Sequence, residues 1–182
     1  MEMQLIRSRR KTLCAEIRSG CLIVRAPLRA SEAEISRFLQ ERKEWIETHL
    51  TRSKERMEAR QNVPPLTDAE RRVLAREAAA VFPERAAFYA GLLGVSYSRI
   101  TVRFQRTRWG SCSSRGNLNF NCLLLLAPPE VLDSVVVHEL CHLRHMDHSP
   151  AFYADVLRVF PDYRKWDRWL KEYGSFLTAR LP

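Results

Sequence analysis

The stretch that decides the fold is residues 128–150, which read PPEVLDSVVVHELCHLRHMDHSP. Two prolines predict a helix start, because a proline in the first turn lacks only a backbone N–H that would have no partner there. Apolar residues then recur at helical spacing, at Leu132, Val136, Leu140 and Leu143. Ser149-Pro150 has the pattern of an N-cap followed by a first-turn proline, so a second helix begins there.

Beside the apolar stripe of the first helix stand His138, Glu139 and His142, the pattern His-Glu-x-x-His. Residues i and i+4 lie one above the other on a helix, so both imidazoles can reach one metal ion at about 2.0–2.1 Å. Glu139 is displaced around the helix, where its carboxylate can reach a metal-bound water and act as general base. The pattern therefore predicts a catalytic Zn²⁺ site.

A third zinc ligand is expected from beyond this helix, because catalytic zinc has three protein ligands and one open position. His145 would lie about 10 Å along the helix axis from His138, too far to share the ion. His148 lies on the turn between the two helices, where a reversal of the chain would bring it over the metal. The spacing of the three histidines equals that of the metzincin proteases, with His145 at the place of their left-handed glycine. Histidine tolerates that conformation better than most residues.

Upstream of residue 128 the pattern changes to strands. Ile100, Val102 and Phe104 alternate with polar residues, which predicts a strand with one apolar face. After a turn at residues 113–116, a return strand at 117–126 begins polar and becomes apolar on both faces. We expect the polar start of this strand, with Asn119 and Asn121, to act as a sheet edge that pairs with an extended peptide.

A helix precedes these strands. Thr67 and Glu70 form a capping box, in which each side chain binds a backbone N–H that lacks a helical partner. The helix should kink or split at Pro83. It should end at Gly94, a residue suited to the left-handed C-terminal position.

The N-terminal part predicts strands followed by a helix. A tight turn at Ser19-Gly20 separates two strands, and a capping box of Ser31 and Glu34 opens a helix that continues to about residue 50. Residues 52–66 are polar, end in two prolines and form the best linker candidate. We therefore expect a β-hairpin and helix subdomain at residues 1–65 and a metal-binding domain at residues 66–182.

Composition narrows the class of protein. The chain has 182 residues, of which 46% are hydrophobic and 28% charged, which excludes a disordered or fibrous chain. Five cysteines without a C-x-x-C pair argue against a disulfide framework or a thiolate zinc site. No apolar run approaches the roughly 20 residues of a membrane span and no secretory signal is evident, so we expect a cytoplasmic protein without a membrane partner.

The net charge of +9 has a local component. Between Glu84 and Glu130 there is no acidic residue, and this gap contains six arginines: Arg85, Arg99, Arg103, Arg106, Arg108 and Arg115. Arginine binds phosphate through a planar fork, so the segment 99–115 is a candidate contact for a nucleotide or nucleic acid. Alternatively, these arginines form the solvated face of an amphipathic strand.

Several motifs together resemble the YgjP-like metallopeptidase family, a relative of the SprT-like and WLM zinc proteases. They are Arg10-Lys11-Thr12-Leu13, Val24-Arg25-Ala26-Pro27, Arg108-Trp109-Gly110-Ser111-Cys112, Gly116-Asn117-Leu118-Asn119-Phe120-Asn121, Leu126-Ala127-Pro128, Val137-His138-Glu139-Leu140-Cys141-His142, His148-Ser149, Phe152 and Pro161-Asp162-Tyr163. The resemblance implies zinc held by His138, His142 and His148, with Glu139 as general base. Ser134 and Tyr153 depart from the family pattern, which usually has Tyr and Trp there.

The expected fold is α+β, with a zincin-like core in which a short β-sheet lies beside the metal-binding helix, plus the N-terminal strand-and-helix piece. The first functional hypothesis is a zinc metallopeptidase acting on a protein or peptide. Zinc would lower the pKa of a bound water toward about 7, and Glu139 would take its proton. Candidate substrate contacts are Arg108, Trp109, Asn119, Asn121 and Tyr153, of which Tyr153 or Arg108 is the candidate oxyanion stabiliser.

Two alternatives remain open. A UTP pyrophosphatase activity is also attributed to the family and would use the same metal site, although phosphate chemistry tends to use Mg²⁺ with carboxylates. The other alternative is a basic adaptor on nucleic acid with a structural zinc, in which Trp109 beside Arg108 stacks on bases. Structural zinc sites usually have four protein ligands, and the sequence offers no evident fourth.

Overall fold

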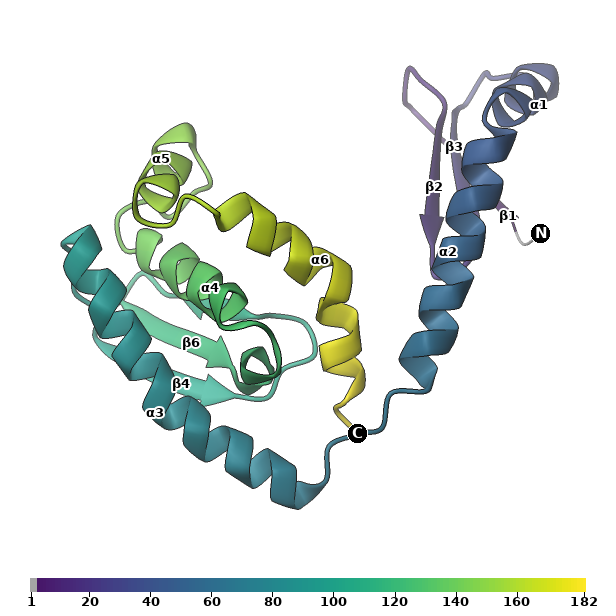
Figure 1. Cartoon of the computed structure of the whole chain (residues 1–182). Helices are drawn as coiled ribbons and strands as arrows, with labels where there is room; N and C mark the ends of the chain where they lie inside the picture. Colours follow the sequence, from purple (N-terminus) through teal and green to yellow (C-terminus); the bar gives the residue numbers. More distant parts are fainter. Residues whose placement is uncertain (1–2) are drawn as a thin grey trace. The chain divides into compact units, whose positions relative to one another are not determined.

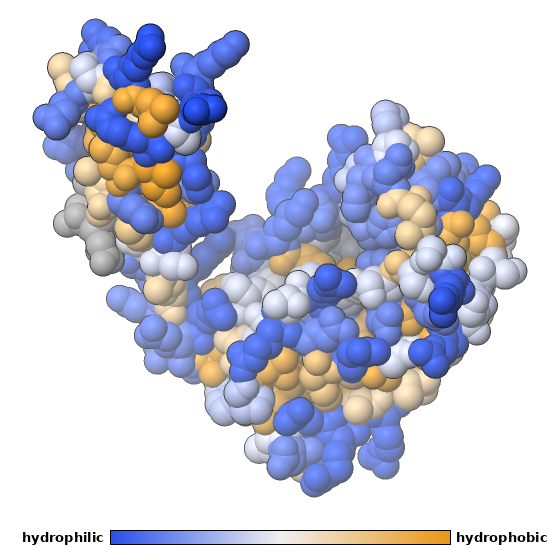
Figure 2. Space-filling view, turned by 180° about the vertical axis from the view of Figure 1, so that it is seen from behind, coloured by the Kyte–Doolittle hydropathy of each residue, from blue (hydrophilic) through white to orange (hydrophobic). Residues whose placement is uncertain are grey.

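The computed structural model describes residues 3–182. The chain divides into two compact units, Met1–Asn62 and Val63–Pro182, where the sequence analysis places the boundary after residue 65. Each unit combines a three-stranded sheet with helices, so the fold class is α+β (Figure 1). Hydrophilic side chains cover most of the visible surface of each unit (Figure 2). Within residues 3–182, none of the helices combines the length and hydropathy that a bilayer span requires.

Unit 1 (Met1–Asn62) contains the strands β1 (Met3–Ser8), β2 (Cys14–Arg18) and β3 (Cys21–Pro27) and the helices α1 (Glu32–Glu41) and α2 (Lys43–Gln61). The strand order is β1-β3-β2, with β3 parallel to β1 and antiparallel to β2. Ser19 and Gly20 form the tight turn between β2 and β3, with φ of 48° and 74°. The predicted hairpin is therefore confirmed.

The core of unit 1 lies between β3 and α2. Leu22 and Val24 alternate along β3 and are fully buried, and Ile46 and Leu50 of α2 belong to the same apolar cluster. The capping box at Ser31 is confirmed, but the helix that it opens ends at Glu41, and α2 then continues to Gln61. The predicted linker at 52–66 is thus wrong over most of its length. Its Lys, Glu, Arg, Met and Ala residues all favour helix.

Unit 2 (Val63–Pro182) contains α3 (Asp68–Leu93), β4 (Arg99–Arg103), β5 (Gly110–Cys112), β6 (Asn117–Asn121), a 3-10 helix η1 (Cys122–Leu126), α4 (Pro129–Cys141), α5 (Pro150–Val159) and α6 (Tyr163–Ala179). The strand order is β4-β6-β5, with β6 parallel to β4 and antiparallel to β5. The predicted return strand at 117–126 is therefore too long. It is also wrong as a sheet edge, because β6 is the central strand.

A side chain explains where β6 ends. Asn121 has extended backbone and its carbonyl Oδ1 accepts a hydrogen bond from the backbone N–H of Leu123 at 3.1 Å. This caps η1 and stops the strand. The apolar run that follows is buried as a 3-10 helix rather than as a strand.

Helix α3 passes through Pro83 without interruption, so the predicted split is wrong. The flanking residues Phe82 and Ala86 are fully buried, and the Phe82 ring stacks on Phe120 of β6 with centroids 4.7 Å apart. Burial of this face offsets the cost of about 3 kcal/mol that a proline carries inside a helix. The capping box at Thr67 and the left-handed C-cap at Gly94 (φ 68°) are confirmed.

Helix α4 is the centre of unit 2. Ten of its 13 residues are buried, and it contacts α3, α5, α6, η1 and the sheet (Figure 1). A helix that is buried on nearly all sides belongs in the middle of a core. The polar side chains that α4 carries near its C-terminal end are therefore held by neighbours on several elements.

Candidate metal centre

Three imidazole rings converge at the end of α4. His138 lies in the last turn of the helix, His142 is its C-cap, and His148 lies in the loop before α5. The Nε2 atom of His138 is 3.2 Å from that of His142 and 3.1 Å from that of His148. All three ligand atoms lie within 4.8 Å of one another. The chain reversal thus brings His148 to the two helical histidines.

The second nitrogen of two of these rings has a fixed partner. Nδ1 of His142 donates to the backbone carbonyl of His145 at 2.9 Å, which leaves Nε2 with a free lone pair. Nδ1 of His138 lies 2.8 Å from the hydroxyl of Tyr163, which orients that ring in the same sense. Hydrogen bonds of this kind are typical of metal-binding histidines, because they fix the tautomer and the ring direction.

Burial favours the neutral form of the two helix-borne rings, His138 and His142. Burial, together with the neighbouring His142 and His148, lowers the pKa of His138 to about 4. Burial also lowers the pKa of His142. Near neutral pH both rings offer a lone pair, as a metal ligand must.

The turn after α4 is not the predicted one. Among residues 3–182 the only non-glycine residue with positive φ is Ser19, so His145 does not adopt the left-handed conformation. Instead, the backbone N–H groups of Arg144 and His145 both donate to the carbonyl of Cys141, at 3.1 and 3.0 Å. The His145 ring binds Asp155 at 3.0 Å and lies outside the three-histidine group.

Glu139 packs against the edge strand β5. It is only 6% exposed, and a Cβ on Gly110 would lie 2.6 Å from both Cγ and Oε1 of Glu139. The backbone N–H of Cys112 donates a hydrogen bond to the carboxylate. Burial outweighs the opposing effect of that hydrogen bond and raises the pKa of Glu139 to about 8. A carboxyl group with a pKa near neutrality can both accept and release a proton.

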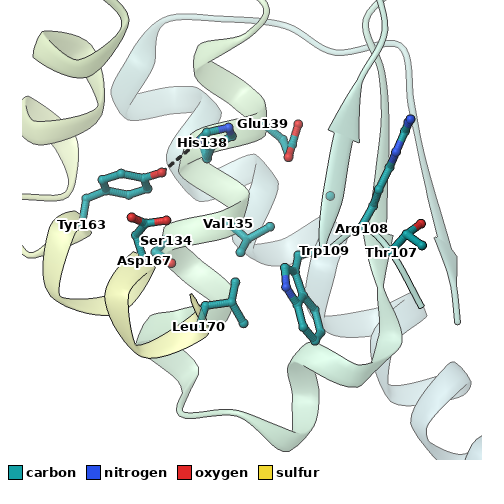
Figure 3. Close-up of a pocket in the computed structure, with 11 residues that line it drawn as sticks. Thr107, Arg108, Trp109, Ser134, Val135, His138, Glu139, Tyr163, Asp167 and Leu170 are labelled. Atoms are coloured by element: carbon teal, nitrogen blue, oxygen red, sulfur yellow. Dashed lines mark hydrogen bonds between the residues drawn. The ribbon is translucent and has the colours of Figure 1, made fainter. Parts of the chain in front are cut away.

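A cavity of about 240 Å³ opens beside these groups. His138 and Glu139 line one end, while Trp109, Val135 and Leu170 form an apolar wall at the other (Figure 3). The Trp109 indole is packed tightly on α6, where a Cβ on Gly174 would lie 2.7 Å from Cζ2. The cavity can therefore take an apolar group next to His138 and Glu139.

The predicted substrate contacts fall into two groups. Trp109 and Arg108 line the cavity, although the Arg108 side chain extends away from His138 and Glu139 in Figure 3. The Tyr153 ring lies 6.2 Å from the His148 ring, measured between centroids. These three residues are thus near the candidate site.

The two asparagines are placed differently. Leu118 and Phe120 of β6 are buried in the core cluster that includes α4, so Asn119, which alternates with them, faces the opposite side of the sheet. Asn121 is 1% exposed and donates to the carbonyls of Gln105 and Arg108, at 2.8 and 2.9 Å. Neither side chain faces the cavity. Asn121 instead fixes the loop that leads into β5.

The six arginines of the acid-free segment do not gather at the site. Arg85 forms a two-pronged ion pair with Asp133, both contacts at 2.7 Å. Arg103 donates to Asn119, and Arg106 donates to the carbonyls of Leu181 and Pro182. Among residues 3–182, Arg108 is the one member of this set that lines the cavity.

Sequence reasoning missed Tyr163 and Gly110 as parts of the site. Tyr163 bonds to His138 across 25 residues, so local spacing carries no signal of it. A glycine in a short strand does carry one, because it often marks a close approach of another group to the backbone.

The chain belongs to the YgjP-like family. The family model described as the YgjP-like metallopeptidase domain matches residues 11–70 and 65–173, which confirms the resemblance seen in the motifs. At the family level the protein is therefore a metallopeptidase, a hydrolase.

Two solved structures are similar to part of the chain. The metallopeptidase zymogen of Pyrococcus abyssi abylysin has 21% sequence identity and a TM-score of 0.47, over 52% of this chain and 96% of that one. The metallopeptidase zymogen of Methanocaldococcus jannaschii jannalysin has 16% identity and a TM-score of 0.45, over 50% of this chain and 94% of that one. No curated protein matches the chain.

Proposed function

We propose that the protein is a zinc-dependent metallopeptidase with a zincin-like core, in which His138, His142 and His148 hold Zn²⁺ and Glu139 is the general base. The observation that carries this proposal is the convergence of three imidazole nitrogens, all within 4.8 Å, next to a buried carboxylate. We further propose a cytoplasmic location, which fits the five free cysteines.

The donor set fits zinc. Three imidazoles without a carboxylate suit zinc better than Mg²⁺, which prefers oxygen ligands. His148 is exposed and, among residues 3–182, no fourth His, Cys, Asp or Glu joins the group. An open side is typical of a catalytic zinc and not of a structural one, so the adaptor hypothesis has no support here.

The reaction needs a proton acceptor near the attacking water. When bound, zinc would lower the pKa of water and polarise the scissile carbonyl. Glu139 accepts the proton of the attacking water and delivers it to the leaving amine nitrogen. The Cys112 N–H holds the carboxylate in place for both transfers, and the absence of a side chain at Gly110 leaves the space that the carboxylate occupies.

Two tyrosines lie next to the histidines and have different proposed roles. Tyr163 is a positioning residue, because its hydroxyl orients His138 through Nδ1. Tyr153 is the better candidate for oxyanion stabilisation, because its ring lies beside His148, whereas the Arg108 side chain extends away from His138 and Glu139 (Figure 3).

The peptide substrate would bind along β5 rather than β6. Strand β6 is paired on both sides, whereas β5 is an edge strand directly beside Glu139. An edge strand offers unpaired backbone groups to which an extended peptide can add. One side chain of that peptide would then enter the cavity lined by Trp109.

A comparison of the wild type with Glu139→Gln tests the proposal. The zinc content of both purified proteins is measured by mass spectrometry, and cleavage is followed on an unfolded protein such as casein. We expect one zinc per chain in both and cleavage only by the wild type. Wild type without zinc, or a variant that cleaves at the wild-type rate, would contradict the proposal. So would hydrolysis of nucleoside triphosphates, UTP included, by a wild type that leaves peptides intact.

A further inference from the structure

A second groove adjoins the cavity at α6. Its volume is about 430 Å³, and its lining includes Tyr153, Arg164, Arg168 and Lys171. Tyr163 and Asp167 line both this groove and the cavity beside His138. A peptide held at the three histidines can therefore continue along α6.

The groove is positively charged. Arg164, Arg168 and Lys171 are spaced four and three residues apart, so they share one face of α6. Asp167 is the one acidic residue that lines the groove in the described part of the chain, and it pairs with Lys171 at 2.6 Å. Three cations thus face one carboxylate.

In the described part of the chain, two of these cations form no ion pair. Arg164 and Arg168 are exposed, and neither forms an ion pair with any residue of the range 3–182. Nearby arginines behave differently, because Arg144 and Arg158 both pair with Asp155, at 3.1 and 3.5 Å. A carboxylate that enters the groove would meet two free guanidinium groups and would break no existing pair there.

We propose that this groove binds a carboxylate of the peptide substrate and gives the enzyme a preference for acidic peptides. The inference rests on the proposed peptidase function and names its substrate class. A guanidinium group binds a carboxylate through two parallel hydrogen bonds, which makes arginine suited to this recognition. The carboxylate comes either from an Asp or Glu side chain or from the free C-terminus of the peptide.

Four fluorogenic peptides test the preference. They share one sequence and differ in Glu or Gln near the scissile bond and in a free or amidated C-terminus. We expect the wild type to cleave a peptide with the added carboxylate with a kcat/KM about two- to fivefold higher, because both guanidinium groups are exposed and solvent screens their attraction for a carboxylate. The Glu and C-terminal arms identify which carboxylate is bound. Equal kcat/KM on all four peptides would overturn the proposal.

The double variant Arg164→Glu/Arg168→Glu assigns the preference to the groove. We expect it to keep its zinc and to lose or invert the ratio of kcat/KM between acidic and neutral peptides. Arg72→Glu/Arg76→Glu is the matched control, because these exposed residues on α3 have the same spacing and the same charge change. A double variant at 164 and 168 that retains the wild-type ratio would overturn the proposal.

A binding measurement without turnover distinguishes an error in the proposed groove from an error in the proposed peptidase function. Glu139→Gln is titrated with labelled acidic and neutral peptides, and affinity is read by fluorescence anisotropy without turnover. Tighter binding of the acidic peptide, lost on charge reversal at Arg164 and Arg168, would support the groove even if no cleavage occurred. Binding of inorganic triphosphate or UTP with no binding of any peptide would overturn it in favour of a phosphate ligand.

Discussion

The two units contain sheets with the same strand order and directions, yet only one carries the histidine cluster. In β1-β3-β2 and in β4-β6-β5 the central strand is parallel to the first strand and antiparallel to the second. In both, alternate residues of the central strand are fully buried, such as Leu22 in β3 and Leu118 in β6. Topology alone therefore does not produce the site.

The difference lies in the helix that covers each sheet. Helix α2 buries Ile46 and Leu50 and exposes most of its remaining residues, whereas α4 is buried on ten of 13. Within that apolar setting α4 presents Glu139 to a three-residue edge strand that has a glycine at the contact. In unit 2 the sheet is thus a rigid support, while the covering helix α4 and the edge strand β5 carry the candidate functional groups.

Removal of the metal should affect unit 2 alone. A metal whose free concentration is about 1,000 times its Kd stabilises the folded state by about 4 kcal/mol. EDTA or His148→Ala should therefore lower the free energy of unfolding of unit 2 by about 4 kcal/mol. Hydrogen exchange of the full chain reads both units at once. We expect faster exchange in α4 and unchanged exchange in β3.

His49→Ala is the control for His148→Ala. The His49 ring stacks on Trp45 of α2 and is not part of the three-histidine group. The substitution His49→Ala should leave zinc content and peptidase activity unchanged. If EDTA altered exchange equally in the two units, the metal would not be confined to unit 2.

Gly110→Ala tests the contact between the edge strand and the helix. The new Cβ would lie 2.6 Å from the Glu139 carboxylate oxygen, which must then move. Because a displacement of about 1 Å at a reacting group can cost roughly 100-fold in rate, we expect kcat/KM to fall by about that factor with zinc retained.

Gly91→Ala is the matched control, since no atom lies within 4 Å of a Cβ built there. It should leave activity unchanged and stabilise α3 by about 0.5–1 kcal/mol, because alanine favours helix over glycine. Wild-type activity in Gly110→Ala would show that the placement of Glu139 does not depend on β5.

Removal of one ion pair in each unit should lower the free energy of unfolding by different amounts, and this difference should be smaller than the effects above. Asp133 of α4 is 8% exposed, and its hydrogen bond holds the pKa of Arg85 above its usual range. Asp133→Asn should lower the free energy of unfolding by about 1–3 kcal/mol, because it leaves a half-buried guanidinium without its carboxylate. Urea midpoints measure the effect.

The matched pair in unit 1 joins Glu16 to Arg25 across β2 and β3, at 3.1 Å, with side chains 30% and 37% exposed. Glu16→Gln should cost about 0.2–1 kcal/mol, since solvent screens the charges. Equal costs in the two variants would show that the greater burial of α4 does not strengthen its pair.

Much of the local structure could be predicted from the sequence, because local signals determine it. The capping boxes, the left-handed C-cap at Gly94 and the N-cap at Ser149 each depend on a few neighbouring residues, and the structure confirms them. The His-Glu-x-x-His pattern likewise depends on one helix. What failed depends on distant contacts: Pro83 is tolerated because Phe82 stacks on β6, and β6 is central because both neighbours pair with it.

The parts of the site that the sequence did not predict have the same explanation. Tyr163 meets His138 only because α6 packs on α4, and Gly110 meets Glu139 only because β5 forms the sheet edge beside that helix. Asn119 was misplaced because the face of a strand that meets the core is known only once its partners are known. The asparagine pattern alone could not say which side α4 covers.

The smallest expected effect comes from titration of the capping-box glutamates, and it should be the same in both units. Glu34 and Glu70 are exposed, and each accepts hydrogen bonds from its N-cap residue, Ser31 or Thr67, which lower its pKa below the usual 4.5. The backbone donors lie 2.7 and 2.8 Å from the carboxylates. The two capping boxes thus have matching geometry.

A carboxylate with a lowered folded-state pKa binds fewer protons in the folded state than in the unfolded chain, so stability rises with pH in that range. Each contribution is complete above the usual pKa and is lost as pH falls through the lowered one. Glu34→Gln and Glu70→Gln keep an acceptor oxygen but cannot titrate. Each substitution should make the stability of its own unit depend less steeply on pH between about pH 3 and pH 6, as measured by hydrogen exchange. Flattening in one unit only would show that the two capping boxes do not contribute equally to stability at acid pH, despite their matching hydrogen bonds.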